Sequence, residues 1–322
     1  MTKILLVRTS SMGDLVHTLP AVTDLARHFP HWRIDWLAEE AFAEIARLHP
    51  AVDKVWACAV RRWRKRLYMP AVWQEISHLR QQLATEHYQV VVDAQGLLKS
   101  AVLGRWASGD VMVGFDRNSI REPVASYFYQ KGYPVSRGLG AVLRNRMLLA
   151  RAFGYQIDEN KVDFGLAALQ LPSVPELSTT PYCVALTATS RPSKEWPETY
   201  WLTLAELLYR QYGWRCVLPW GNEKERERAE RLAQQMPAAF VPPRLSLTEA
   251  AALLLHAACV VGVDTGLSHL ANALDKPLVA LYTDTDPAKT GVIPSLRARN
   301  LGGVGQLPTP HEVLAVVNEV MC

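Results

Sequence analysis

The chain has 322 residues, which is more than one hydrophobic core usually organises and suits two domains of about 150 residues each. Hydrophobic residues make up 49% and charged residues 20%, a composition that excludes a disordered chain. The net charge of +4 comes from the first half of the chain. Residues 1–165 carry 22 Lys and Arg against 16 Asp and Glu, whereas residues 166–322 carry 13 Lys and Arg against 15 Asp and Glu. A nucleic-acid-binding protein is therefore not expected.

The sequence shows no export or membrane-insertion signal. Its first residues lack the apolar core of about 7–15 residues and the small cleavage-site residues of a signal peptide. The longest nearly apolar run, Ala250 to Val263, is shorter than the roughly 20 residues of a spanning helix. The five cysteines are scattered without a C-x-x-C pair, which favours reduced thiols. We expect a cytoplasmic protein.

Short apolar runs alternate with segments of helical period, which is typical of βα units around a parallel sheet. The first domain should cover residues 1–165. Its strands are expected at Ile4–Val7, Ile34–Ala38, Lys54–Val60, Gln89–Asp93 and Val111–Phe115, and its helices at Leu15–Arg27, Ala41–Arg47, Val72–Leu83, Leu98–Trp106 and Leu139–Phe153. The proline-rich stretch that follows indicates a linker at residues 166–180.

The same alternation returns in a second domain, residues 181–307, and a helix at residues 308–322 ends the chain. Strands are expected at Cys183–Thr187, Arg215–Pro219, Phe240–Val241, Cys259–Val263 and Leu278–Tyr282, and helices at Tyr200–Gln211, Lys224–Gln234, Leu247–Ala257, Leu267–Ala273 and His311–Met321. The fold class is α/β, with two doubly wound domains facing a cleft. In such domains ligands bind at the carboxyl ends of the strands.

The first candidate loop, Thr9 to Asp14, joins a strand to a helix. It lacks the G-x-G-x-x-G and P-loop patterns, which disfavours a dehydrogenase or a nucleoside triphosphatase. Gly13 permits close approach of the backbone to a ligand. Asp14 lies at the helix start, where it is either the N-cap residue or a functional carboxylate.

Two loops in the second half suit a diphosphate. In the loop from Val263 to Leu270, the N–H groups of Thr265, Gly266 and Leu267 open a helix and favour a pyrophosphate. Asp264 could brace that loop, and His269 could reach a phosphate or sugar hydroxyl or be a structural residue.

The other loop, Thr187 to Trp201, offers the hydroxyls of Thr189 and Ser190 and the charge of Lys194, which suit a diphosphate leaving group unless the lysine is merely exposed.

Three further features have a competing structural interpretation. Glu225 could hold ribose hydroxyls, although the surrounding charge run indicates a solvated helix face. Asp284 and Asp286 form a D-x-D pattern without neighbouring His, Cys or further acids, so we favour no metal site. The block RRWRKR, residues 61–66, is either a solvated helix face or a site for anionic groups.

Taken together, the motifs TSSMGDLVHTLPA, RRWRK, DAQGLLKS, KEWP, LPWG and VDTGLSHL resemble glycosyltransferase family 9, the heptosyltransferases of lipopolysaccharide biosynthesis. The resemblance extends from Ile4 to about Pro287. The Ser-Ser-Met-Gly-Asp form is closer to the type I branch than to type II, which typically carries Trp-Val-Gly-Asp. The sequence departs from the family at Thr283-Asp284, so the family's local backbone near the diphosphate is not assumed there. It also departs at Gly140 and Leu143, and no role is carried over to these two positions.

The resemblance implies a type B glycosyltransferase fold of two Rossmann-like domains. It also implies inverting transfer of L-glycero-D-manno-heptose from ADP-heptose to the first Kdo residue of Kdo2-lipid A. The enzyme would work peripherally on the cytoplasmic face of the inner membrane, with no cofactor and no metal requirement.

Residue by residue, the resemblance assigns Asp14 as the general base and Lys194 as the second catalytic residue. Donor binding is assigned to Ser11, Gly13, Thr189, Ser190, Pro219, Glu225, Leu245, Asp264, Thr265, Gly266, Leu267 and His269. Acceptor binding is assigned to Arg61, Arg62, Arg64, Lys65 and Arg121.

Physical chemistry adds two expectations. A helix start should lower the pKa of Asp14, which would make it a weak base that accepts its proton late in bond formation. Trp63, Leu67 and Tyr68 lie among basic residues, so they could contact the membrane interface, although Trp63 could equally belong to the core.

Three alternatives remain at this point. A type II heptosyltransferase would use another acceptor. A bilobed sugar-binding protein would need no base opposite phosphate donors. A sugar-nucleotide epimerase would require several acids and histidines around the sugar.

Overall fold

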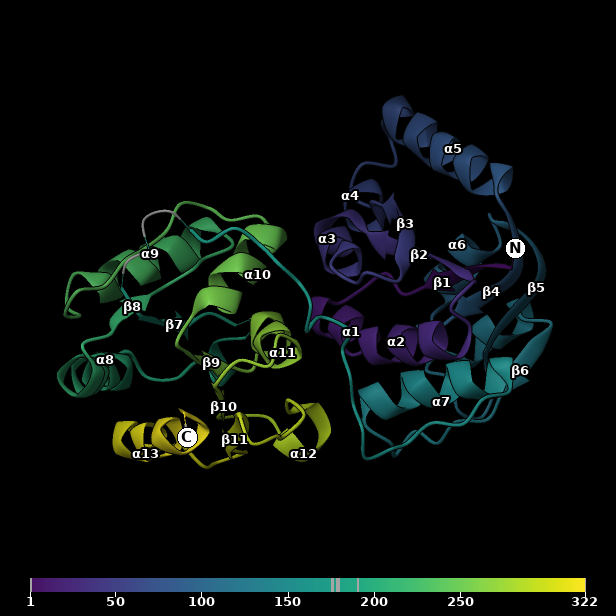
Figure 1. The fold of residues 1–322 in the computed structure, drawn as a ribbon. Coiled ribbons are helices and arrows are strands. Elements are labelled where there is room, and N and C mark those ends of the chain that lie inside the picture. The colour runs from purple at the N-terminus through teal and green to yellow at the C-terminus, as the bar shows by residue number, and fades with distance from the viewer. Residues whose placement is uncertain (1, 175–176, 178–179, 190, 322) are drawn as a thin grey trace. The chain divides into compact units, whose positions relative to one another are not determined.

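The computed structural model describes residues 2–174, 177, 180–189 and 191–321. The chain divides into two compact units, residues 1–166 and residues 167–322. Each unit is a parallel sheet with helices between successive strands (Figure 1).

Unit 1 contains a six-stranded parallel sheet in the order β3-β2-β1-β4-β5-β6. Its strands are β1 (Lys3–Val7), β2 (Arg33–Glu39), β3 (Val52–Cys58), β4 (His87–Asp93), β5 (Ser108–Phe115) and β6 (Lys131–Tyr133). The central strand β1 is an apolar run in which residues 4–7 are at most 1% exposed, as a strand covered on both faces requires. The strand order reverses beside β1, and the loops that follow β1 and β4 meet at that point.

The helices of unit 1 are α1 (Met12–Val16), α2 (Leu19–His28), α3 (Ala43–Arg47), α4 (Val60–Trp63), α5 (Pro70–Thr85), α6 (Leu98–Gly104) and α7 (Ala141–Phe153). Short 3-10 turns cover Glu40–Phe42 and Pro123–Phe128. Helices α2 and α7 pack against each other (Figure 1). A buried ion pair joins them, with Arg146 Nε 2.6 Å from Asp24 Oδ2. This contact fixes the helix that carries Arg144 and Asn145.

The single helix expected over Leu15–Arg27 is wrong, because the segment forms two helices. The first ends at Val16, and Thr18 is the N-cap residue of the second, with Pro20 in its first turn. Proline suits a first helical turn because the N–H that it lacks would have no partner there. The break leaves Asp14 on a helix of only five residues.

The strand expected at Lys54–Val60 is shifted in the structure. β3 ends at Cys58, and Val60 with the first three residues of the basic block forms α4 instead. The strand β6 was not expected. It is three residues long, and its Lys131 and Gly132 are exposed, so it carries no apolar pattern.

Unit 2 contains a five-stranded parallel sheet in the order β11-β10-β9-β7-β8. Its strands are β7 (Tyr182–Leu186), β8 (Arg215–Val217), β9 (Cys259–Val263), β10 (Leu278–Tyr282) and β11 (Ala298–Gly302). The strand expected at Phe240–Val241 is not formed, and only a single β-bridge joins Phe240 to Val217. The strand expected at Arg215–Pro219 is shorter, since β8 ends at Val217. The edge strand β11 was missed because its Arg299 and Asn300 break the apolar pattern.

The helices of unit 2 are α8 (Glu198–Tyr212), α9 (Glu223–Ala233), α10 (Leu247–His256), α11 (Gly266–Ala273), α12 (Pro287–Thr290) and α13 (Pro310–Met321). Its core contains Trp196 and Trp201, whose rings meet edge to face with centroids 4.9 Å apart. Cys58, Cys183, Cys216 and Cys259 are buried free thiols, as expected, while Cys322 lies outside the described residues. Across the described ranges, no helix combines the length and the apolar composition needed to cross a bilayer.

Candidate active site

The loop after β1 presents a carboxylate that its own neighbours hold in place. Asp14 is the third residue of α1, and Ser11 is the N-cap residue, so the N-cap interpretation of Asp14 is wrong. The Ser11 backbone N–H donates to Asp14 Oδ2 at 2.6 Å, and the Ser11 hydroxyl lies 3.0 Å from the same oxygen. The first contact is the one that the third residue of a helix makes to the N-cap N–H in a capping box. It leaves Asp14 Oδ1 for other partners.

Arg8, the residue that follows β1, takes up that second oxygen. Its Nη2 lies 2.7 Å from Asp14 Oδ1, and its Nη1 donates to the Ala94 carbonyl. The Arg8 side chain is 11% exposed and that of Asp14 is 35% exposed, so water screens the pair only in part. Burial raises the pKa of Asp14, but the charge of Arg8, the bonds from Ser11 and the charge of His17 outweigh it. The pKa therefore lies below its ordinary value.

The expected direction of the Asp14 shift is confirmed, but its main cause differs. The helix that holds Asp14 has only five residues, and the nearby Arg8 lowers the pKa more than any other favourable contact. An ionised carboxylate next to a guanidinium is a weak base, because protonation must compete with the ion pair. Asp14 is therefore ionised at neutral pH.

A buried polar network supports this loop from β4. Asp93, at the end of β4, accepts hydrogen bonds from the N–H groups of Gln95 and Gly96 and from the Ser100 and Tyr129 hydroxyls. The Gln95 side-chain oxygen then accepts from both the N–H and the hydroxyl of Thr9, each at 2.7 Å. Burial raises the pKa of Asp93, against the effect of these four bonds.

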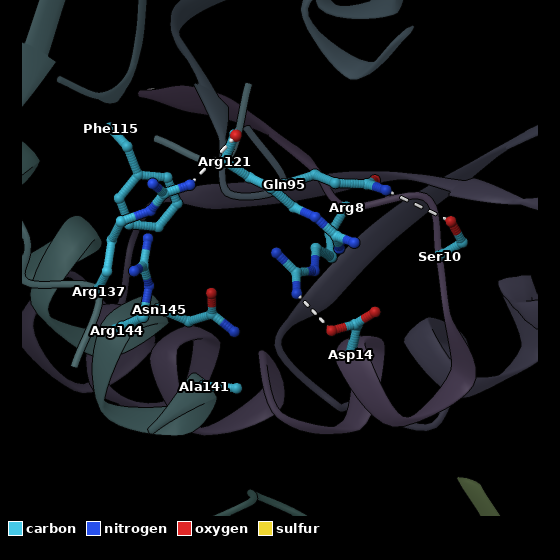
Figure 2. A pocket seen from close by; sticks show the side chains of 10 residues that line it. All are labelled: Arg8, Ser10, Asp14, Gln95, Phe115, Arg121, Arg137, Ala141, Arg144 and Asn145. Carbon is cyan, nitrogen blue, oxygen red and sulfur yellow. Dashed lines mark hydrogen bonds and ion pairs between the residues drawn. The ribbon is translucent and has the colours of Figure 1, made fainter. Parts of the chain in front are cut away.

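The Asp14 carboxylate faces a pocket of about 220 Å³ (Figure 2). Its lining comes from the loops after β1, β4, β5 and β6, from the end of β5 and from the start of α7. The lining residues are Arg8, Ser10, Asp14, Gln95, Phe115, Arg121, Arg137, Ala141, Arg144 and Asn145. Arg121 is among them, whereas Arg61, Arg62, Arg64 and Lys65 are not. Ser11 and Gly13 belong to the Asp14 loop without lining the pocket.

The basic block divides into paired and unpaired residues. Arg62 pairs with Glu40 and Glu75, and the Arg61 guanidinium lies 4.7 Å from the Phe42 ring centroid. Arg64 and Lys65 are exposed, and no carboxylate among the described residues pairs with either.

The membrane-contact interpretation of Trp63 is wrong, because its side chain is buried and its Nε1 donates to Glu75. Leu67 and Tyr68 are exposed.

In unit 2, a second carboxylate lies at the carboxyl end of β9. Asp264 Oδ2 is 2.6 Å from Lys194 Nζ and accepts the Thr285 hydroxyl at 2.9 Å. The Thr189 hydroxyl donates to the Asp264 carbonyl at 2.9 Å. Three loops, those after β7, β9 and β10, thus meet at Asp264. Ser190 lies outside the described residues.

Helix α11 begins directly after Asp264, with Thr265 as its extended N-cap residue and Gly266 and Leu267 as its first two residues. The close approach of α11 to β9 depends on Gly262, where a Cβ would lie 2.5 Å from the Ser268 hydroxyl. His269 is 7% exposed within the first turn of α11. The helix start therefore presents backbone N–H groups beside the Lys194 ammonium group, a combination that favours anions.

Glu225 caps its own helix. One of its oxygens accepts from the Gly221 N–H at 2.8 Å and the other from the Asn222 side chain at 2.6 Å. A hydrogen bond from Trp220 Nε1 to the Pro242 carbonyl joins the two nearby loops, which carry the buried Pro219 and the half-buried Leu245. These residues therefore form one region at the end of β8.

The D-x-D pattern has structural partners. Asp286 is the N-cap residue of α12 and accepts from the Ala288 N–H, and Thr285 donates to Asp264. Over the described residues there is no group of three or more His, Cys, Asp or Glu side chains that could hold a metal ion.

Several site residues were not found from the sequence, namely Arg8, Gln95, Asp93, Arg137, Arg144 and Thr285. Asp93 and Gln95 lie in the quoted motif DAQGLLKS, where a carboxylate that ends an apolar strand was the available signal. Arg144 is a cation in the first turn of α7, a position that the helix dipole disfavours. Arg137 and Thr285 carry no local signal.

Comparison with known proteins places this geometry in a family. Residues 76–312 match the model for glycosyltransferase family 9 (heptosyltransferase). The chain is 48% identical over 289 residues to lipopolysaccharide heptosyltransferase 1 of Pseudomonas aeruginosa, covering 90% of this chain and 81% of that one.

Two solved structures of E. coli heptosyltransferase WaaC, each 40% identical to this chain, are also similar. The complex with ADP has a TM-score of 0.92, covering 99% of this chain and 100% of that one. The complex with ADP-2-deoxy-2-fluoro heptose has a TM-score of 0.88, with 99% of each chain covered. The expected type B fold is confirmed.

The Arg8 contact generates a prediction about proton binding. In Arg8→Met the main group that lowers the pKa of Asp14 is gone, so that pKa should rise. Asp14 would then protonate at a higher pH, and the stability that its ionised form contributes above the unfolded pKa would diminish. Titration of the Asp14 carboxyl ¹³C signal by NMR measures the shift.

Arg33→Met is the matched control, since Arg33 is an exposed arginine at the start of β2 whose nearest carboxylate oxygen, on Asp53, is 3.9 Å away. It should leave the Asp14 titration unchanged. An unchanged titration in Arg8→Met would show that Arg8 does not set the charge state of Asp14.

Proposed function

This chain belongs to glycosyltransferase family 9, and from that premise we propose that it transfers L-glycero-D-manno-heptose from ADP-heptose to the first Kdo residue of Kdo2-lipid A. The observation that carries the proposal is the 48% identity to a lipopolysaccharide heptosyltransferase 1 over 90% of the chain. The likeness to an enzyme solved with ADP and with an ADP-heptose analogue supports the donor.

In the proposed reaction unit 1 supplies the base. The acceptor hydroxyl oxygen forms a bond to the anomeric carbon of the heptose, the bond to the diphosphate oxygen breaks, and ADP leaves with the electron pair. The hydroxyl proton passes to Asp14, and attack opposite the leaving group inverts the anomeric centre. Because Arg8 lowers the pKa of Asp14, the proton moves late, once the new bond has acidified the hydroxyl.

Unit 2 supplies the contacts to the leaving group. Lys194 has three N–H donors and uses one on Asp264, so two remain for a diphosphate oxygen. The first N–H groups of α11, those of Gly266 and Leu267, add donors along the helix dipole. Both features stabilise the charge that develops on ADP, and this chemistry needs no metal. The donor's adenosine would lie near Pro219, Glu225 and Leu245.

A surface of unit 1 suits the membrane side of the reaction. Leu67, Tyr68, Met69 and Trp73 are exposed apolar or aromatic side chains, with exposures of 46%, 83%, 37% and 57%. They adjoin the exposed cations Arg64, Lys65 and Arg66 in the chain. Aromatic side chains among basic ones are typical of surfaces that bind anionic membrane interfaces. We assign this set, residues 64–69 with Trp73, to peripheral contact with the cytoplasmic leaflet.

The base assignment predicts a selective loss. With ADP-heptose and deacylated Kdo2-lipid A in a chelating buffer, Asp14→Asn should lower kcat about 10²-fold to 10⁴-fold, the usual contribution of a general base. Calorimetry should still detect ADP-heptose binding, because the contacts proposed for the diphosphate and the adenosine are in unit 2. Wild-type turnover should be the same with and without chelator.

Asp53→Asn, at an exposed carboxylate of unit 1, is the control and should retain wild-type turnover. An active Asp14→Asn enzyme would remove Asp14 as the base. Donor binding without any transfer by the wild type would support the sugar-binding alternative, and turnover only on an acceptor that already carries heptose would indicate a type II enzyme.

The leaving-group assignment predicts an effect on kcat rather than on acceptor binding. Lys194→Gln should lower kcat about 10²-fold to 10³-fold with the acceptor KM unchanged, since a donor to the developing charge is lost. Lys194→Arg keeps the charge and the Asp264 contact and should recover part of the rate. Lys289→Gln, an exposed lysine of α12, is the control.

Because Lys194→Gln leaves the 9%-exposed Asp264 without its cation, thermal melting must show that the variant is folded. A raised acceptor KM with normal kcat would contradict the assignment.

The membrane assignment predicts salt-dependent binding to anionic vesicles. Tyr68→Ser combined with Trp73→Ser should weaken cosedimentation with phosphatidylglycerol vesicles at least 5-fold, because two aromatic side chains no longer enter the interface. Turnover on the deacylated, soluble acceptor should not change. Tyr209→Ser, at a 44%-exposed tyrosine of unit 2, is the control. Equal vesicle binding by all three proteins would contradict the assignment.

A further inference from the structure

The pocket beside Asp14 carries an unusual excess of positive charge. Four arginine side chains, Arg8, Arg121, Arg137 and Arg144, line it, and Asp14 is the one carboxylate among its lining residues (Figure 2). Arg8 is bound to Asp14, which leaves three guanidinium groups without a counter-charge. Within the described ranges, no ion pair includes Arg121, Arg137 or Arg144. The pocket is therefore built for an anion.

The Arg144 guanidinium is held in place by two backbone carbonyls and an aromatic ring. Its Nη2 donates to the Ser119 carbonyl at 2.9 Å and its Nη1 to the Ser136 carbonyl at 3.3 Å. Its guanidinium also lies 4.8 Å from the ring centroid of Phe115, which covers one face of the group. These contacts fix the plane of the guanidinium while Nε remains available. The group is pre-organised, so little further entropy is lost when a ligand binds.

The position of Arg144 is costly without a ligand. Burial lowers its pKa, and the charges of Arg137 and Arg8 lower it further. Arg144 also lies in the first turn of α7, where the helix dipole disfavours a cation. A bound anion would relieve all of these costs at once.

Arg137 and Arg121 extend the site toward solvent. Arg137 Nη2 donates to the Arg121 carbonyl at 3.2 Å, which links the two segments, and both side chains are exposed. Other arginines of unit 1 without a carboxylate partner, such as Arg64 and Arg151, are exposed, whereas Arg144 is half-buried. A half-buried guanidinium without a counter-charge is what distinguishes this pocket from the exposed arginines of the unit.

We propose that Arg137 and Arg144, with Arg121 at the rim, form a carboxylate site that binds the acid group of the acceptor sugar and so places its hydroxyl at Asp14. This inference rests on the proposed function, because it takes a sugar acid as the acceptor. A planar carboxylate matches the fork of an arginine guanidinium better than it matches a lysine. The pocket volume of about 220 Å³ is below the roughly 300–1,000 Å³ of sites for drug-sized ligands, which suits a single sugar unit.

The proposal divides acceptor recognition between two regions. The pocket would bind the sugar acid next to the base, while Arg64 and Lys65 on the outer block would meet phosphates farther along the acceptor. Loss of a pocket arginine should then affect even a minimal acceptor, whereas loss of the outer cations should affect only an acceptor that carries lipid A phosphates.

The test combines a protein change with a ligand change. Arg144→Gln and Arg137→Gln are compared with wild type on an acceptor whose reacting Kdo has either a free carboxylate or a methyl ester. Each variant should raise the KM of the free acid about 10-fold to 100-fold, the range for one charge-assisted hydrogen bond, and leave the ADP-heptose KM unchanged. Methylation of the acceptor should raise its KM for the wild type by a similar factor. It should raise the acceptor KM of Arg144→Gln only slightly further, because the two changes remove the same contact.

Arg151→Gln is the matched control, since Arg151 is an exposed arginine on the last turn of the same helix. It should respond to the ester as the wild type does. Fully additive losses in Arg144→Gln would overturn the proposal, and so would a raised ADP-heptose KM, which would assign the arginines to the donor diphosphate.

A binding measurement separates this inference from the proposed function. Free Kdo and its methyl ester are titrated into the protein by NMR without donor, so no transfer is needed. Tighter binding of the acid than of the ester, lost in Arg144→Gln, supports the carboxylate site even if the heptosyl transfer proves wrong. Equal affinity for the acid, the ester and inorganic phosphate, or equal affinity in the variant, overturns it. Thermal melting confirms that each variant is folded.

Discussion

Unit 1 depends on one buried carboxylate. Asp93 ends strand β4, the neighbour of the central strand β1, in a fully buried position. It accepts four hydrogen bonds, from Gln95, Gly96, Ser100 and Tyr129. These bonds turn the chain sharply after β4 and direct Gln95 back to Thr9, at the start of the loop that carries Asp14. The loop that leads to Asp14 therefore depends on hydrogen bonds to a carboxylate that is buried from solvent. Exchange of Asp93 for an apolar residue would leave buried donors without acceptors, which is costly.

Much of the fold could be predicted from local patterns. Fully apolar runs such as Ile4–Val7 and Cys259–Val263 have one stable environment, a strand covered on both faces, so their assignment needed no tertiary information. Two of the four edge strands, β6 and β11, could not be predicted in this way. β6 and β11 contain Lys131, Arg299 and Asn300, and they exist because a neighbouring strand offers hydrogen bonds. The Leu15–Arg27 segment divides before Pro20, which lies in the first turn of the second helix, where a proline is tolerated.

The candidate site shows the same limit. Asp14, Lys194 and the Asp264 loop could be found because each lies where an apolar strand gives way to a helix, and parallel strands bring such loops together. The ion pair between Lys194 and Asp264 joins residues 70 positions apart, and the pocket unites Arg8 with Arg144 across more than 130 positions. Contacts of this kind depend on tertiary packing, of which a single sequence carries no local trace. The block Arg61–Arg66 shows the opposite error. Its local charge pattern suggested a site for anionic groups, but Trp63 is buried and Arg62 is paired with Glu75.

The unpaired guanidinium groups of the pocket should also affect the rate at which an anion reaches the protein. Three uncompensated charges at the edge of a low-dielectric cavity set up a field that attracts anions from a distance and raises their encounter rate. At physiological ionic strength that field extends roughly 8 Å, and at 1 M salt roughly 3 Å. Capture of an anionic substrate should therefore slow as salt is added. The short contacts that Asp14 makes with Arg8 and Ser11, at 2.7 and 2.6 Å, should be much less sensitive to salt. The pocket arginines should therefore raise the association rate of an anionic ligand as well as its affinity.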